Sequence, residues 1–129
     1  MLTDTHCHLL KCYYDDIDLY IKEAIDNDVK RIIVAATNLS ECKEVIELGK
    51  SYENVYYCLG IHPEFYNEDF GELEKIVYDV EKDPKFVAIG EIGLDYHYDK
   101  DHKVEQIELF KKQLELAERL NLPFFVHNS

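Results

Sequence analysis

The chain has 129 residues, of which 47% are hydrophobic and 32% charged, a balance typical of one folded domain rather than a disordered segment. Its formal net charge is −13, from 14 basic and 27 acidic residues, which excludes the basic face of a protein that binds nucleic acid through phosphate contacts alone. The charge does not exclude a nuclease, because bound divalent cations supply positive charge where phosphate oxygens sit.

The sequence also bears on the compartment. No apolar run approaches the roughly 20 residues that cross a bilayer, and the start MLTDTHCHLL lacks the basic region of a secretory signal. The four cysteines, Cys7, Cys12, Cys42 and Cys58, form no CxxC pair and are interpreted as reduced thiols. We therefore expect a cytoplasmic protein that does not contact a membrane.

Five runs rich in β-branched and aromatic residues predict strands, roughly at residues 2–8, 31–37, 55–61, 86–91 and 123–127. Several are almost continuously apolar (IIVAA, FVAIG, FFV), as parallel strands covered on both faces are.

Four amphipathic segments separate these runs and predict helices. The second is expected to begin after Ser40 as N-cap and to end before Gly49 as C′ residue. The third stops before Pro84 and the fourth ends near Asn121. The apolar stripes of the first, third and fourth segments are, in that order, Ile17, Ile21, Ala24 and Ile25; Leu73, Ile76, Val77 and Val80; and Ile107, Phe110, Leu114 and Ala117.

This β-α alternation predicts a parallel α/β fold, and both a doubly wound sheet and a barrel satisfy it. A closed (β/α)₈ barrel takes about 250 residues. Four βα units and a fifth strand, with no linker or second domain, amount to about half of such a barrel.

Potential ligands collect where the predicted strands end. They are His6 and His8 after the first strand, His62 after the third, Glu91 at the end of the fourth and His127 at the end of the fifth. In parallel α/β folds the C-terminal strand ends share one face, which carries the active site.

The pair His6-Cys7-His8 is the sharpest local motif. Residues two apart on a strand point the same way, so two imidazoles here can bind one metal ion. An HxH pattern alone is weak, and two surface histidines near a terminus are the alternative interpretation.

Glu91 lies in AIGEIGLDYH, and a carboxylate that ends a buried strand is costly unless it is paired or bound to metal. Its flanking residues Gly90 and Gly93 permit close approach and unusual backbone angles. A salt bridge to a neighbouring strand is the alternative. His127, in LPFFVHNS, repeats the design of an apolar strand ending in a ligand.

Three residues are candidates for substrate binding. His62 precedes Pro63 and is expected to be extended, and it either helps bind substrate or shapes the loop. Asp95 and Tyr96 follow Glu91 on the loop above the predicted site, with ordinary loop packing as the alternative.

Together, DTHCHL, GIHP, GEIGLDY and LNLPFFVH resemble the TatD family of metal-dependent deoxyribonucleases, in order and through the whole chain, including the segment QIELFKKQLELAERLNLP. The resemblance implies a TIM (β/α) barrel of the metal-dependent hydrolase type. Residues 1–129 are then a single partial domain, roughly its N-terminal half.

The resemblance also implies a site for two divalent ions, Mg²⁺, Mn²⁺ or Zn²⁺. His6 and His8 would hold one ion, His127 the second, and Glu91 would bridge them as the catalytic carboxylate. The family adds a His and an Asp from later strands that are not in this sequence, and its frequent Arg two residues after the fifth-strand His is Ser129 here.

The function implied is cleavage of DNA phosphodiester bonds by metal-activated water. One alternative keeps the metals but hydrolyses a carboxylic ester or amide, as amidohydrolases do. The other is not an enzyme: either an inactive, truncated half-barrel or a fragment that self-associates through its open edges.

Overall fold

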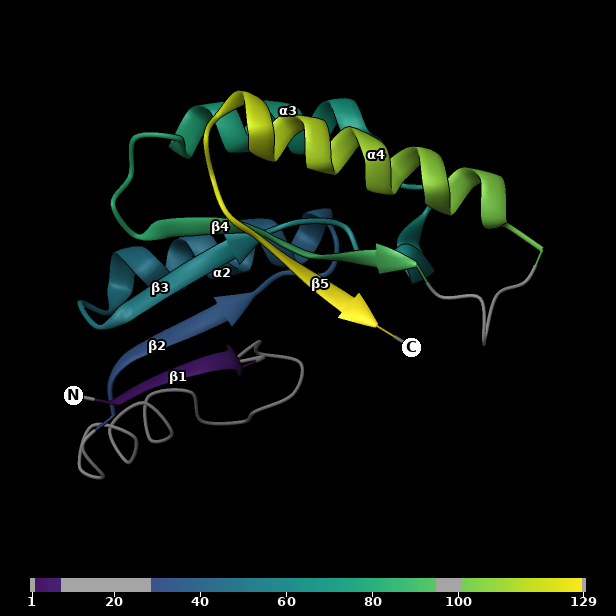
Figure 1. Cartoon of the computed structure of the whole chain (residues 1–129). Helices are drawn as coiled ribbons and strands as arrows, with labels where there is room; N and C mark the ends of the chain where they lie inside the picture. Colours follow the sequence, from purple (N-terminus) through teal and green to yellow (C-terminus); the bar gives the residue numbers. More distant parts are fainter. Residues whose placement is uncertain (1, 8–28, 95–100, 129) are drawn as a thin grey trace.

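A computed structural model describes residues 2–7, 29–94 and 101–128, and contains one sheet of five parallel strands in the order β1-β2-β3-β4-β5 (Figure 1). The strands are β1 (Leu2–Cys7), β2 (Val29–Ala35), β3 (Val55–Leu59), β4 (Phe86–Leu94) and β5 (Phe124–Asn128). All five predicted strands are therefore confirmed. β2 begins and ends two residues earlier than predicted, because β1 pairs with it from Leu2 and Val29 onward.

Helices α2 (Leu39–Ser51), α3 (Phe70–Val80) and α4 (Lys103–Arg119) and the short 3₁₀ helix η1 (Pro63–Phe65) connect the later strands (Figure 1). The first predicted helix lies outside the described residues. The alternation and the all-parallel order confirm an α/β fold of the (β/α) barrel type, present as about half a barrel. Among the described residues, no helix has the length and apolarity needed to span a bilayer.

The two faces of the sheet are packed differently. One face, with Ile32, Tyr57 and Ile89 fully buried, forms the main core with the three helices. The other face carries the small buried residues Ala35, Cys58 and Ala88, with half-buried hydrophobic residues around them. Cys42 and Cys58 are both buried thiols, as the interpretation of the cysteines as reduced thiols predicts.

Both predicted ends of α2 are wrong. The N-cap is Asn38, whose Oδ1 accepts from the Glu41 N–H at 2.9 Å, and Ser40 is already inside the helix. The helix continues through Gly49 to Ser51. Gly49 serves packing instead, because a Cβ there would lie 2.9 Å from Cδ1 of the Tyr57 ring.

In α3 the predicted stripe is confirmed, with Leu73 and Val77 buried. In α4 the stripe is displaced: of the four predicted residues only Ala117 is fully buried, and Ile107, Phe110 and Leu114 are half-buried. The centre of the buried face is Gln106, Leu109, Gln113 and Leu116. An apolar pattern overlooks this face because two of its members are polar. The helix ends at Arg119, and the nearby Asn121 has a left-handed φ of 55°.

Lys85 binds three backbone carbonyls near the N-terminal ends of the strands. Its Nζ donates to the carbonyls of Gly49, Tyr52 and Val55 at 2.9, 2.8 and 2.8 Å, and so satisfies the end of α2 and the start of β3. On the same edge the Tyr57 hydroxyl donates to the Asp83 carboxylate at 2.7 Å.

We predict that Lys85→Met lowers the free energy of unfolding by about 2 to 3 kcal/mol, because three carbonyls lose a charged donor. Urea denaturation measures this, with Lys82→Met, at an exposed position three residues earlier, as the matched control. Equal effects of the two substitutions would contradict the role assigned to Lys85.

Candidate functional site

The strand ends that carry the predicted ligands lie along one edge of the sheet, because all five strands are parallel. His6 is the next-to-last residue of β1, and His127 has the same place in β5. Glu91 lies in β4, next to β5, where His127 pairs with Gly93. β1 is at the opposite side of the described sheet from β5. His8, Asp95 and Tyr96 lie outside the described residues.

Strand pairing is irregular at two of these positions. The β1–β2 register shifts between Asp4 and Cys7, a span that includes His6, and the β4–β5 register shifts between Ile89 and Ile92, a span that includes Glu91. Such bulges are common beside active sites, where they redirect a side chain. β4 also continues three residues past Glu91, its predicted end, because β5 pairs with it as far as Leu94.

Glycines near Glu91 allow close contact between the backbones of neighbouring strands. Gly90 and Gly93 have φ of 158° and 156°, which confirms the unusual backbone angles expected around Glu91. A Cβ on Gly60 would lie 2.9 Å from the Gly90 carbonyl carbon, and a Cβ on Gly90 would lie 3.1 Å from the Phe125 Cβ. Only glycine at both positions lets β3, β4 and β5 approach this closely.

His62 follows β3 and is held on both its backbone and its side chain. It is extended, as predicted from Pro63, with φ −66° and ψ 147°. Its N–H donates to the Thr37 carbonyl at 2.8 Å, and its Nδ1 accepts from the Glu64 N–H at 3.3 Å. These bonds support the loop-shaping interpretation of His62. Its contact with substrate stays a prediction.

Two carboxylates near the C-terminal ends of the strands were not predicted from the sequence. Glu41, 8% exposed, accepts from both the N–H and the hydroxyl of Thr37, and Glu68 accepts from the Leu39 N–H at 2.8 Å. They close the turn between β2 and α2 and add negative charge near the strand ends. The Asn38-x-x-Glu41 spacing, which resembles a capping box, was the available signal.

Cys42, in α2, has its Sγ 3.8 Å from the carbonyl of Gly60, in the loop that follows β3. Burial raises the pKa of its thiol to about 12, and the neighbouring charges of Glu41 and Glu68 act in the same direction. The thiolate is therefore suppressed at neutral pH, which excludes Cys42 as a nucleophile.

Metal ligation itself stays a prediction. Where side chains are described, no three His, Cys, Asp or Glu residues gather closely enough to hold an ion. For His6, Glu91 and His127 the structure describes the strand backbone, so that statement does not include their side chains.

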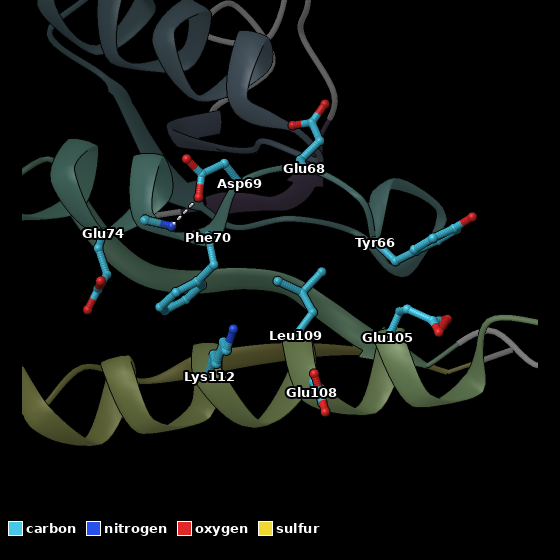
Figure 2. Close-up of a pocket in the computed structure, with 10 residues that line it drawn as sticks. Tyr66, Glu68, Asp69, Phe70, Glu74, Glu105, Glu108, Leu109 and Lys112 are labelled. Carbon is cyan, nitrogen blue, oxygen red and sulfur yellow. Dashed lines mark hydrogen bonds between the residues drawn. The ribbon is translucent and has the colours of Figure 1, made fainter.

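A pocket of about 450 Å³ opens in the helical layer, between α4 and the segment from Tyr66 to the start of α3 (Figure 2). Lys112 reaches across it, with Nζ 5.8 Å from the centre of the Phe70 ring. Five acidic side chains line it: Glu68, Asp69, Glu74, Glu105 and Glu108. Such a lining repels phosphate, so this pocket is not the candidate site for a phosphodiester.

Comparison with known proteins places the chain in a family. Residues 3–129 match the family described as TatD related DNase. The chain is 37% identical over 133 residues to a Bacillus subtilis protein named uncharacterized metal-dependent hydrolase YabD, covering 99% of the chain and 51% of that protein. It is 31% identical over 112 residues to the 3'-5' ssDNA/RNA exonuclease TatD of Shigella flexneri, covering 87% of the chain and 43% of the relative.

A solved structure of a TatD homolog also matches this chain. The crystal structure of YjjV, a TatD homolog from Escherichia coli K12, matches with a TM-score of 0.85 at 32% identity, over 98% of this chain and 50% of that one. The chain thus spans about half the length of the curated relatives it matches.

We predict that Cys42 and Cys58 resist an aromatic disulfide reagent at about pH 8 in the folded protein and react in urea, as read by mass spectrometry of labelled peptides. Burial raises the pKa of Cys42 from 9.0 to about 12. The contribution of the protonated Cys42 thiol to the free energy of unfolding is therefore complete below pH 9 and is lost as the pH rises from 9 to about 12. Labelling of Cys42 in the folded chain as fast as in urea would contradict its burial.

Proposed function

Because the chain belongs to the family of TatD-related DNases, we propose that it acts as a divalent-metal-dependent hydrolase, a TatD-like deoxyribonuclease that cleaves phosphodiester bonds by metal-activated water. The observation that carries the proposal is the single edge of a parallel sheet at which His6, Glu91 and His127 occupy strand positions. This is the edge at which α/β folds carry their active sites.

The proposed ligands are His6 and His8 for one ion, His127 for a second, and Glu91 between them. The ladder also shifts at Leu2/Thr3 and Tyr57/Cys58, but the irregular pairing around His6 and Glu91 supports this set because bulges are over-represented beside active sites. Imidazole-rich ligand sets suit Zn²⁺ or Mn²⁺, whereas Mg²⁺ prefers oxygen. When bound, such ions polarise a phosphoryl oxygen and lower the pKa of water.

The remaining roles fall to groups around that edge. His62, Asp95 and Tyr96 are proposed to contact the DNA strand. For His62 the support is a fixed backbone and a ring held by the Glu64 N–H. The chain has a net charge of −13, so it repels DNA except where bound cations reverse the local sign. Substrate binding is therefore expected to depend on metal as much as catalysis does.

We predict that the chain digests labelled single-stranded DNA with Mn²⁺ or Mg²⁺, that chelation abolishes the digestion, and that Glu91→Gln reduces it at least about 100-fold, since a lost ligand removes several kcal/mol of transition-state stabilisation. Glu118→Gln, at an exposed position near the end of α4, is the matched control and keeps the rate within about twofold, as surface changes distant from a site do.

A substrate panel run beside the DNA assay decides between the enzymatic alternatives. Cleavage of a carboxylic ester or amide without cleavage of DNA would replace the nuclease by an amidohydrolase-like enzyme. Equal rates for Glu91→Gln and the wild type would contradict the proposed site. Inactivity on every substrate would contradict an enzymatic role for this chain.

A second candidate function is self-association, favoured by an apolar surface on β5. Phe124 and Val126 are each 44% exposed. They pair with Ile89 and Ile92, which are fully buried beneath the helices, so they lie on the helix side of the sheet but are only partly covered. Burying such residues against a second copy removes apolar area from water.

If the chain self-associates through β5, Val126→Lys shifts it towards monomer in light scattering, because a charge on the buried contact is costly. Val104→Lys is the matched control, since Val104 is 65% exposed on α4, away from β5. A wild-type chain that is monomeric at all accessible concentrations would exclude this candidate.

A further inference from the structure

The loop that leads into His62 is held at nearly every polar backbone atom. The Ile61 N–H donates to Gln113 Oε1 at 2.8 Å, and Gln113 Nε2 donates back to the Ile61 carbonyl at 3.0 Å. The Gly60 carbonyl accepts from Cys42 Sγ at 3.8 Å, and the His62 N–H donates to the Thr37 carbonyl at 2.8 Å. The two consecutive peptide groups before His62 are thus each bound at both ends.

Gln113 is the central member of this arrangement. It lies on α4, 52 residues from Ile61, and is 1% exposed. A buried carboxamide is costly unless both its ends are bonded, and here the oxygen and the nitrogen each have a backbone partner. A carboxamide can accept from one peptide group and donate to the next, whereas an ionised carboxylate lacks the donor and a thioether lacks a strong group of either kind.

The fixed backbone also determines the state of the imidazole. His62 Nδ1 accepts from the Glu64 N–H at 3.3 Å, which places the proton of the neutral ring on Nε2. The Glu64 carboxylate lies 3.5 Å from the same Nδ1, but Nδ1 cannot accept from the amide and donate to the carboxylate at once. The shorter, amide contact favours the tautomer of the neutral ring that has its proton on Nε2.

This arrangement gives more than stability. An apolar side chain in the same space would leave the Ile61 N–H and carbonyl without these partners, whereas the two-point hydrogen bond both satisfies them and specifies an orientation. α4 also joins β4, which carries Glu91, to β5, which carries His127. The Gln113 contact therefore couples the placement of His62 to the segment between two proposed ligand strands.

We propose that Gln113 is a positioning residue for His62: by binding both polar atoms of Ile61 it fixes the backbone that presents the His62 imidazole, with its proton on Nε2, to a phosphate of the substrate. The inference rests on the proposed function for the role of His62 at the phosphate, and on the structure for the contact with Gln113.

The test compares Gln113→Met with Tyr57→Phe in the full chain. Tyr57→Phe is the matched control, because it removes a side-chain hydrogen bond of β3, the one to Asp83, that does not involve the loop before His62. In ¹⁵N spectra of the imidazole, Gln113→Met is expected to turn the single Nε2–H tautomer of His62 into a mixture, and Tyr57→Phe to leave it unchanged. A merely structural role would not distinguish the two variants.

Activity adds a second readout. Gln113→Met is expected to raise KM for single-stranded DNA about tenfold with a smaller effect on kcat, because a displaced phosphate contact weakens binding before and during reaction alike. Gln113→Glu should not restore KM, because an ionised carboxylate loses the donor and places an oxygen against the Ile61 carbonyl.

The wild type alone tests the contact if the variants do not fold. Hydrogen exchange of the Ile61 and His62 amides should be slower than that of Asn67, at an exposed turn position, by about 100-fold or more. Rapid exchange of both amides, or a His62 tautomer unchanged in Gln113→Met, would overturn the inference whatever the activity. A changed tautomer in a chain without hydrolase activity would instead contradict the proposed function and leave the positioning contact standing.

Discussion

Close contact between the backbones of β3, β4 and β5 underlies the arrangement of the candidate site. Gly60 lies against Gly90, and Gly90 lies against Phe125, at distances that admit no Cβ without a shift of backbone. The contact lies just after the end of β3, at the residue before Glu91 in β4 and near the start of β5, within the span where the β4–β5 register changes. The glycines thus join three strands at the level where the proposed ligand positions occur, and the small residues Ala35, Cys58 and Ala88 continue this tight packing on the same sheet.

The two edges of the sheet use polar groups in different ways. At the N-terminal edge, Lys85 and the Tyr57–Asp83 pair satisfy backbone and side-chain groups and have no candidate ligands beside them in the described chain. At the C-terminal edge, Glu41 and Gln113 hold the turns from which the site is built. This division follows the general separation in (β/α) barrels between a stability face and a catalytic face.

The sequence predicted the elements of the fold better than the contacts between them. The strands and α3 follow from local apolar patterns, which burial against a single layer imposes directly. The ends of α2 do not, because Asn38 competed with Ser40 as a cap and because Lys85, far along the chain, allows the helix to pass Gly49. The buried face of α4 differs from the predicted apolar stripe because Gln113, on that face, is polar. The burial of Gln113 is explained by its two hydrogen bonds to the backbone of Ile61, which an apolar pattern does not reveal. For the site, the positions of His6 and His127 near strand ends could be predicted from the sequence, whereas β4 continues past Glu91 and Glu41 is recognised only once its bonds to Thr37 are known.

The three carbonyls held by Lys85 have a consequence for synthesis on the ribosome. They belong to α2, to the connection after it and to β3, and lie 30 to 36 residues before the lysine that binds them. A nascent chain that has released only β2, α2 and β3 therefore leaves the end of α2 without its cation. That segment must wait, incompletely capped, until β4 emerges, so co-translational folding of this half-barrel should advance in steps of more than one βα unit.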